Sequence, residues 1–389
     1  MGANGEVSQS VKSVLPIAID AMGGDLGLEV QVEGAVRAFK EFGSDSILVG
    51  PSLELRSVIE SLGASSLPIA IEDAPDTISM EDSPSKAVLR KPQASLCVAY
   101  QLVESGRASA MMSSGNSGAM MAAGTIISGL MPGIKRPAIA TLLPGLGENP
   151  PNVVIDSGAN VDCHAHNLVQ FAVMGAIYYS CLFNVDHPKV ALLSNGTEAS
   201  KGTDILRAAA IEIARLQRIN YVGYIEGRDI PTDKAQVIVC DGFVGNVALK
   251  AMEGCVRLIA DQLTHESQRT LGGKLGQFLL RGVFHEVFRQ RFDYTAHGGA
   301  PLLGLRRLAV VLHGSSDARA VMNAIRVSAA FARARMCERI GTELAQLEDE
   351  SIAPLENIFS NVMSRKGEGK SEPAAGEERA KVRGKERDS

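Results

Sequence analysis

Residues 113–124, "SSGNSGAMMAAG", combine a glycine-rich turn with the start of an apparent helix. An apolar run precedes the turn and small helix-forming residues follow it, which is typical of a strand-to-helix junction. Unpaired N–H groups and the helix dipole favour an anion at such a junction. We therefore predict that phosphate binds the N–H groups of Gly115, Asn116, Ser117 and Gly118. A capped helix after a tight turn fits the same letters, whereas a Ser117 nucleophile is disfavoured because GxSxG is absent.

Lys201 lies in a second polar turn, "GTEASKG" at residues 196–202, directly after a predicted strand. An ammonium group neutralises a phosphate or the charge that develops on a carbonyl oxygen. We predict that Lys201 and Asn116 are the catalytic residues and that Glu198 contacts substrate. A solvated loop lysine without a role is the alternative interpretation.

Two more turns follow apolar runs. "DAMGGD" begins at Asp20 and resembles a phosphate-binding loop only loosely, because it lacks GxGxxG and GKS or GKT. In "CDGFVGNVALKAMEG", the residues Asp241, Asn246 and Lys250 can face one cleft, since the last two are one helical turn apart. Helix capping and a surface lysine would produce the same pattern.

Metal-binding signals are weak. His164 and His166 lie beside Asp162 in "DCHAH", but HExxH spacing is missing, so a capped turn is favoured over a metal site. The six cysteines are scattered without a CxxC pair. We predict no metal ion and no bound cofactor.

The composition is that of an ordinary globular enzyme. Hydrophobic residues make up 45% of the 389 residues, aromatic residues 4%, and the formal net charge is −5. A negative chain argues against nucleic-acid binding, which needs a basic surface. The first residues lack the apolar core of a signal peptide and no apolar run reaches membrane-spanning length, so we expect a cytoplasmic protein.

Short apolar strands alternate with helical stretches over most of the chain, which predicts a mostly parallel sheet covered by helices on both faces. Polar residues follow many of these strands, where α/β sheets bind ligands. The predicted strands end near residue 20 and span 46–50, 67–73, 108–114, 137–144, 152–158, 189–196, 235–242 and 307–314. The predicted helices span 28–42, 85–105, 166–182, 203–218 and 318–347.

A helical hairpin is predicted at about 246–292, and its second arm carries an apolar stripe. Core packing, a dimer contact and a membrane-surface contact all fit this stripe, with the first two favoured on pattern alone. We divide the chain into a flexible extension (1–15), a catalytic domain (16–363) and a disordered charged tail (364–389). The stripe consists of Leu275, Phe278, Leu279, Val283, Phe284, Val287 and Phe288.

Together these stretches resemble the bacterial phosphate acyltransferases, which make acyl phosphate from acyl carrier protein thioesters. The matching letters run in the family's order over about 17–330 and include "IAIDAMGGD", "SSGNSGAMMAAG", "KRPAIAT", "DSGANVDC", "QFAVMGAIYY", "KGTDI", "CDGFVGNVALKAMEG" and "HGGAPLLGL". The chain departs from the family at Leu26, Gly27 and Leu28, where His-Ala-Pro is usual, and at Thr197, where an acid is expected.

The resemblance implies a Rossmann-like three-layer α/β/α sandwich, related to phosphate acetyltransferases and isopropylmalate dehydrogenases, with a projecting helical hairpin. It also implies a homodimer at the membrane surface that passes acyl phosphate to a membrane-bound glycerol-3-phosphate acyltransferase. Phosphopantetheine would arrive on the carrier protein. A phosphate acetyl- or butyryltransferase using coenzyme A, a decarboxylating dehydrogenase and a non-catalytic scaffold are the alternatives. The expected substrate-binding residues are Asp20, Gly23, Gly24, Gly115, Ser117, Gly118, Asp156, Asn160, Glu198, Asp241, Asn246 and Lys250.

Overall fold

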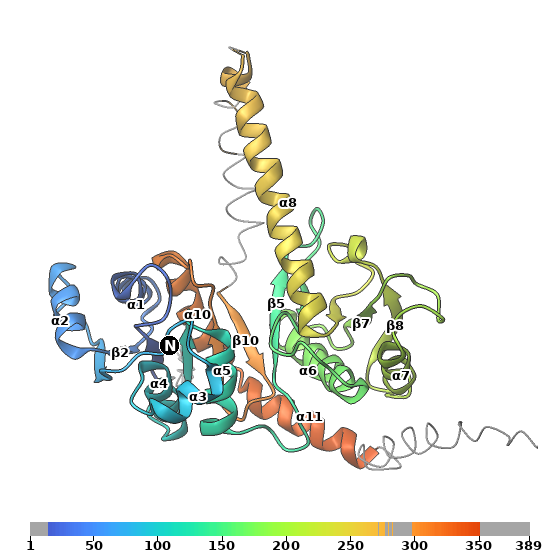
Figure 1. Cartoon of the computed structure of the whole chain (residues 1–389), viewed down its shortest axis with the longest axis horizontal. Helices are drawn as coiled ribbons and strands as arrows, with labels where there is room; N and C mark the ends of the chain where they lie inside the picture. The colour runs from blue at the N-terminus through green and yellow to red at the C-terminus, as the bar shows by residue number, and fades with distance from the viewer. Residues whose placement is uncertain (1–14, 271, 277–278, 280–281, 283–297, 351–389) are drawn as a thin grey trace, which may run out of the picture. The chain divides into compact units, whose positions relative to one another are not determined.

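The computed structural model describes residues 15–270, 272–276, 279, 282 and 298–350 (Figure 1). Residues up to Leu347 belong to one compact unit and Glu348–Ser389 to a second. The predicted extension, the charged tail and most of the second hairpin arm lie outside the described residues.

One eleven-stranded sheet organises the first unit, in the order β3-β2-β1-β4-β11-β10-β5-β6-β9-β7-β8. Its strands are β1 (Ile17–Asp20), β2 (Ser46–Gly50), β3 (Ala70–Asp73), β4 (Ala110–Ser113), β5 (Ala138–Leu143), β6 (Asn152–Ile155), β7 (Lys189–Leu193), β8 (Asn220–Ile225), β9 (Val237–Val239), β10 (Ala300–Leu303) and β11 (Ala309–Val311). The helices are α1 (Leu28–Phe42), α2 (Ser52–Ser61), α3 (Pro84–Arg90), α4 (Ser95–Glu104), α5 (Ser117–Ala123), η1 (Gly124–Ser128), α6 (Ala165–Phe183), α7 (Asp204–Ile213), η2 (Gly227–Asp229), α8 (Gly242–Gln268), α10 (Ala318–Arg333) and α11 (Met336–Glu350).

Strand direction reverses across the centre of the sheet. The strands from β3 to β11 are mutually parallel, and so are those from β6 to β8. Between the two sets, β10 is antiparallel to β11 and β5, and β5 is antiparallel to β6. The mostly parallel α/β sheet is therefore as predicted, but its two halves run in opposite directions.

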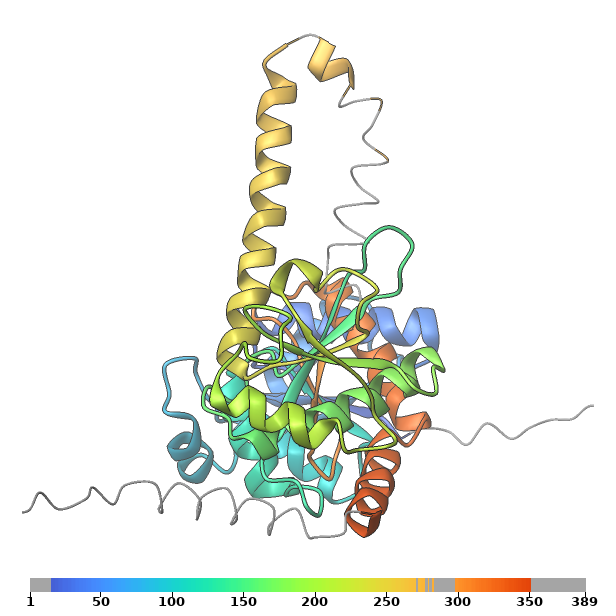
Figure 2. The same cartoon turned by 90° about the vertical axis from the view of Figure 1, so that its right-hand side faces the viewer.

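Helices cover both faces because successive residues of a strand point to opposite sides. In β1, Ile17 and Ile19 join a core cluster containing residues of α1, α10 and α6, whereas Ala18 joins a cluster containing residues of α4 and α5. In the other half, a third cluster includes β6 and β9 side chains packed against Leu249 and Met252 of α8. These layers form the predicted three-layer sandwich (Figures 1 and 2).

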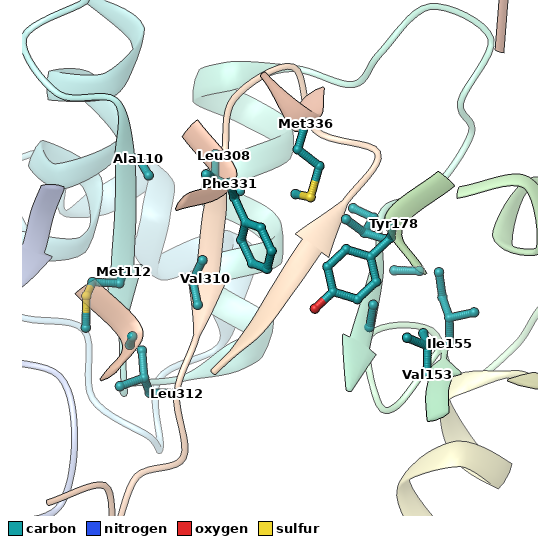
Figure 3. Close-up of a cluster of buried hydrophobic side chains, with 14 of the residues drawn as sticks. Ala110, Met112, Val153, Ile155, Tyr178, Leu308, Val310, Leu312, Phe331 and Met336 are labelled. Atoms are coloured by element: carbon teal, nitrogen blue, oxygen red, sulfur yellow. The ribbon is translucent and has the colours of Figure 1, made fainter. Parts of the chain in front are cut away.

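The two halves share a continuous core. Tyr178 of α6 meets Phe331 of α10 edge to face, with ring centroids 5.6 Å apart and an interplanar angle of 64°. Such edge-to-face pairs add about 0.5–1.5 kcal/mol beyond simple burial. Figure 3 shows this pair among side chains from both halves, including Val310 and Ile155. The cavity described below thus lies over a sheet whose halves are packed together.

Two predicted helices are each divided. The stretch at 85–105 forms α3 and α4 because Pro92, between them, lacks an N–H and disfavours helical backbone before it. The stretch at 318–347 divides at Arg335, whose φ of 51° is left-handed and ends the helical geometry. Strands β8 and β10 were not predicted from sequence.

Helix α8 leaves the sheet after one turn. Of its 27 residues, only Gly242 and Gly245 are buried. Figures 1 and 2 both show it extending away from the strands. Among the described residues, no helix is sufficiently long and apolar to cross a membrane.

Candidate active site

A cavity of about 370 Å³ lies over the centre of the sheet, within the usual range for small-molecule sites. Its floor comes from β5, β10 and β11, one wall from the turn after β4, and the other from the first turns of α8. The lining includes Asp25, Gly115, Ser117, Ile139, Thr141, Ser157, Gly158, Asn246, Leu249, Lys250, Glu253, Val311, His313 and Ser316.

Asp20, at the end of β1, holds the first wall together. Its side chain is buried and accepts hydrogen bonds of 2.6 Å from both Ser95 Oγ and Ser113 Oγ. Burial raises the pKa of this carboxyl, although the hydrogen bonds from the two serines act in the opposite direction. Asp20 therefore positions the turn after β4 and does not line the cavity.

Gly23 permits the closest contact between the loops after β1 and β4. A Cβ at this position would lie 2.8 Å from the Gly115 nitrogen and 2.9 Å from an Asp20 carboxylate oxygen. Ser114 Oγ donates to the Gly23 carbonyl oxygen at 3.0 Å, and Gln31 Nε2 donates to Ser114 Oγ at 2.8 Å. The neighbouring Gly24 has a φ of 100°, which glycine adopts without strain. Both glycines serve loop geometry.

The Asn116 side chain makes its hydrogen bonds within the protein. Its Oδ1 accepts from the Ala119 N–H at 3.0 Å as the cap of α5, and its Nδ2 donates to the carbonyls of Ser79 and Met80, both at 3.3 Å. The Gly115 N–H donates to Ser113 Oγ, so it does not point at a free ligand. Within the described residues, no protein acceptor faces the N–H groups of Asn116, Ser117 and Gly118. Of these three residues, Ser117 lines the cavity, whereas Asn116 and Gly118 are not among its lining residues.

Asp156 plays the corresponding role in the other half of the sheet. It is buried after β6 and accepts from the N–H groups of Gly158, Ala159 and Asn160 at 3.1, 2.9 and 2.7 Å. Burial raises its pKa, and these hydrogen bonds oppose the change. The Asn160 amide bridges Asp156 and the Pro137 carbonyl, at 2.8 and 2.7 Å. This network fixes the loop that brings Gly158 to the cavity.

The start of α8 is anchored to that loop. Asp241 caps α8 by accepting from the Val244 N–H at 2.8 Å, and the Gly242 N–H donates to the Asn160 carbonyl at 2.7 Å. A Cβ on Gly158 would lie 3.7 Å from Asn246. Asn246 and Lys250 consequently line the cavity together, as the sequence predicted for a common cleft.

Lys250 is the cation of this wall. Its Nζ lies 2.9 Å from Glu253 Oε2 and 3.2 Å from His313 Nε2. On the other side of the ring, Nδ1 lies 2.7 Å from Ser315 Oγ. The Ser315 N–H also donates to Nδ1, at 3.2 Å. Ser315 and Lys250 therefore hold the His313 ring from both of its nitrogens.

Lys201 does not line the cavity. Its side chain folds over Gly196 in its own loop, and its strand β7 is six positions from β4 and runs in the opposite direction. The residues that line the cavity include neither Lys201 nor Asn116. Because β6, β9 and β7 are neighbouring parallel strands, the loops after them share an edge, and Lys201 and Glu198 belong with Asp241 and Asn246.

Sequence reasoning did not select His313, Asp25 or Glu253. His313 lies two residues after the end of β11 and near the end of the strand predicted at 307–314, so the strand-end argument that selected Asp20 would also have found it. Asp25 reaches the site because its N–H donates to the Gly314 carbonyl at 2.8 Å, a contact between distant segments. Among the described residues, no three His, Cys, Asp or Glu side chains form a metal-binding group.

The fold and cavity define an α/β enzyme that presents N–H donors and a lysine to an anion beside apolar walls. Residues 15–339 match the family described as fatty acid synthesis protein. The chain is 42% identical over 340 residues to the phosphate acyltransferase of Syntrophotalea carbinolica, covering 86% of this chain and 97% of that protein. It is 43% identical over 331 residues to the phosphate acyltransferase of Geobacter sulfurreducens, covering 84% and 94%.

The chain therefore belongs to the phosphate acyltransferase family and is an acyltransferase. Among solved structures, its fold is similar to a phosphotransacetylase from Streptococcus pyogenes, with a TM-score of 0.57, 21% identity and coverage of 82% and 94%. The EutD phosphotransacetylase from Staphylococcus aureus has a TM-score of 0.54 and 16% identity, with the same coverage. These two similarities support the α/β fold.

Proposed function

We propose that the enzyme transfers a fatty acyl group from an acyl carrier protein thioester to inorganic phosphate. The acyl phosphate would then serve a membrane-bound glycerol-3-phosphate acyltransferase. The observation that carries this proposal is the cavity itself, whose lining combines Ser117 of the turn after β4, Lys250 and His313 with apolar strand residues. The N–H and lysine groups suit an anion and an acyl carbonyl oxygen, and the apolar residues suit the rest of the acyl group.

Phosphate is already a nucleophile near neutral pH, so no covalent acyl-enzyme is required. The N–H groups of Asn116, Ser117 and Gly118, together with Lys250, would bind phosphate next to the thioester carbonyl. A phosphate oxygen attacks the carbonyl carbon, the C–S bond breaks, and the sulfur leaves as a thiolate that takes a proton from water. Alignment of this kind contributes about 7–11 kcal/mol to catalysis.

The carbonyl oxygen gains negative charge during the attack and needs donors of its own. Asn246 lies on the same wall as Lys250, so its amide can serve this oxygen. Losing one such donor typically costs roughly 3–4 kcal/mol of transition-state stabilisation. The pH-stable amide of Asn246 and the charge of Lys250 therefore have separate roles in the proposed reaction.

Lys201 is proposed to act from the β7 side of the site, where the phosphopantetheine arm would pass. Lys201→Ala should leave the fold intact, lower phosphate-dependent cleavage of acyl carrier protein, and weaken binding of the carrier more than binding of phosphate. Unchanged kinetics for both substrates would remove Lys201 from the site.

The docking of an acidic carrier protein requires positive charge on the enzyme. Lys135 and Arg136 lie near His164 and His166, whose rings stack with centroids 5.6 Å apart. Burial and then the charges of His164, Lys135 and Arg136 lower the pKa of His166. The two cationic side chains of this cluster support the proposal that it binds the carrier protein.

The second candidate function uses coenzyme A thioesters instead of carrier protein, and the fold similarity to phosphotransacetylases favours it as the alternative. Turnover with palmitoyl carrier protein and palmitoyl coenzyme A, measured at equal concentrations, separates the two. We further propose that the enzyme is a cytoplasmic homodimer that associates peripherally with the membrane. Light scattering and liposome flotation test those two statements.

The decisive experiment incubates the protein with palmitoyl carrier protein and phosphate, and traps acyl phosphate with hydroxylamine. Because thioesters also react with hydroxylamine, the reaction without phosphate is the baseline. We expect phosphate-dependent acyl hydroxamate together with free carrier thiol. Release of thiol without any increase in hydroxamate would contradict the proposal.

A further inference from the structure

A second hollow, of about 690 Å³, runs along α8 beside the cavity. One side is formed by the end of β5 at Leu143 and the following Pro144, and the other by α8 residues as far as Asp261. We call this hollow the α8 groove. Its volume is also in the range of ligand-binding sites.

The α8 groove and the cavity are continuous. Leu249, Lys250, Glu253 and His313 line both of them. The groove therefore opens at the Lys250–His313 contact, where the proposed reaction takes place. A molecule with its reactive group at this contact can extend directly into the groove.

The helix presents an apolar stripe to the groove. Leu249, Met252, Val256 and Ala260 are half-buried and recur every three or four residues, which places them on one face of α8. Lys250 and Arg257, on the flank, are exposed. From Leu249 to Ala260 the stripe is about 16 Å long at 1.5 Å per residue. The α8 groove therefore extends along the helix and has an apolar stripe on its helical side.

We propose that the α8 groove binds the acyl chain of the thioester, with the carbonyl at Lys250 and the methyl end directed along α8. This inference rests on the proposed function. A saturated chain has no polar atoms and gains roughly 0.8 kcal/mol for each buried CH₂ group. The phosphopantetheine arm contains amides that lose free energy when they are buried without hydrogen bonds. The apolar stripe thus selects the chain over the arm.

Val256→Trp tests the proposal because the larger side chain would fill the middle of the α8 groove. With carrier protein bearing palmitoyl, octanoyl or butyryl groups, we expect kcat/KM for palmitoyl to fall at least tenfold and that for butyryl to stay within twofold. Cys255→Trp is the matched control, since Cys255 is the next residue, is exposed and does not line the groove. It should leave all three substrates within twofold.

Ala260→Leu is a milder obstruction that keeps the test valid if Val256→Trp fails to fold. It should affect palmitoyl and spare octanoyl, because it lies farther from Lys250. An equal loss for all chain lengths in a folded variant would assign the groove to another part of the substrate, and unchanged palmitoyl kinetics in both variants would place the chain elsewhere. If the wild-type protein makes no acyl phosphate, the proposed function itself fails, which is a separate result.

Discussion

Ser113 Oγ donates a 2.6 Å hydrogen bond to the buried carboxylate of Asp20 while it accepts the Gly115 N–H at 3.0 Å. The serine hydroxyl therefore links the end of β1 to the turn after β4 through two hydrogen bonds. This hydrogen bond of Gly115 fixes the backbone of the turn. It thereby positions the N–H groups that have no protein acceptor among the described residues, at Asn116, Ser117 and Gly118. A buried carboxylate thus fixes the turn at which we propose that phosphate binds.

Gly23→Ala should disturb this turn. The added Cβ would lie 2.8 Å from both the Gly115 nitrogen and Ser113 Oγ, so the turn must shift. Overpacking of this kind costs about 1–3 kcal/mol of unfolding free energy. We expect the KM for phosphate to rise severalfold, measured by steady-state kinetics, while the KM for the acyl carrier changes less. Gly227→Ala is the control because nothing lies within 4 Å of its Cβ position; a normal phosphate KM in Gly23→Ala would contradict the role of the turn.

The local parts of the fold were predictable because their signals are contained in short stretches. The helix at 28–42 and the strand at 46–50 agree with the structure residue for residue, since apolar spacing and a Gly boundary define them. Strand β10 has only four residues, includes Pro301 and pairs antiparallel with partners far away in sequence. Its pairing, and hence the reversal of strand direction, depends on tertiary contacts.

The candidate site was predictable to the same degree. Ser117 of the turn after β4, Asn246 and Lys250 line one cavity, and each follows the end of a strand. The pairing of Asn116 with Lys201 stays a prediction, because the lining of the cavity includes neither residue. The contact between Asp20 and Ser113 joins residues 93 positions apart, for which a single sequence contains no signal.

Lys250→Met should abolish most activity while preserving the fold. The methionine keeps the aliphatic stem but loses the charge beside His313, so phosphate would lack its cation. We expect kcat/KM for phosphate to fall by about 10²–10³, the usual effect of losing one such interaction. Lys250→Arg should retain part of the activity. Lys234→Met, which breaks an ion pair with Asp229 outside the cavity, is the control. Full activity in Lys250→Met would exclude this lysine from phosphate binding.

The titration of Asp20 predicts how stability depends on pH. Burial raises its pKa above the ordinary value of 3.8, so the folded protein holds this proton to higher pH than the unfolded chain does. Its contribution to stability is therefore complete below pH 3.8 and is lost as pH rises through the folded-state pKa. Relative to Asp20→Asn, which does not titrate, wild type should lose unfolding free energy as the pH rises above 3.8. Urea unfolding at a series of pH values above 3.8 measures this difference. If the unfolding free energy of wild type increased with pH relative to that of Asp20→Asn, the prediction would be wrong.

Membrane association makes a prediction about the apolar stripe of the hairpin. Leu275 and Leu279 are 61% and 71% exposed, whereas Phe278, Val283, Phe284, Val287 and Phe288 lie outside the described residues. Burying one leucine side chain in an apolar phase is worth about 1.5–3 kcal/mol, so Leu275→Glu with Leu279→Glu should reduce flotation with liposomes at least tenfold. Turnover of a soluble short-chain thioester should not change.

Leu53→Glu is the control for that change, because Leu53 of α2 is 83% exposed and is not part of the stripe. It adds one negative charge where the hairpin variant adds two, and it removes one exposed leucine, so a general effect of acidity on flotation appears in it in part. If both variants float with liposomes as wild type does, the stripe packs in the protein core or forms a dimer contact. If only the hairpin variant is released and its dimer remains intact, the stripe is the part of the chain that contacts lipid.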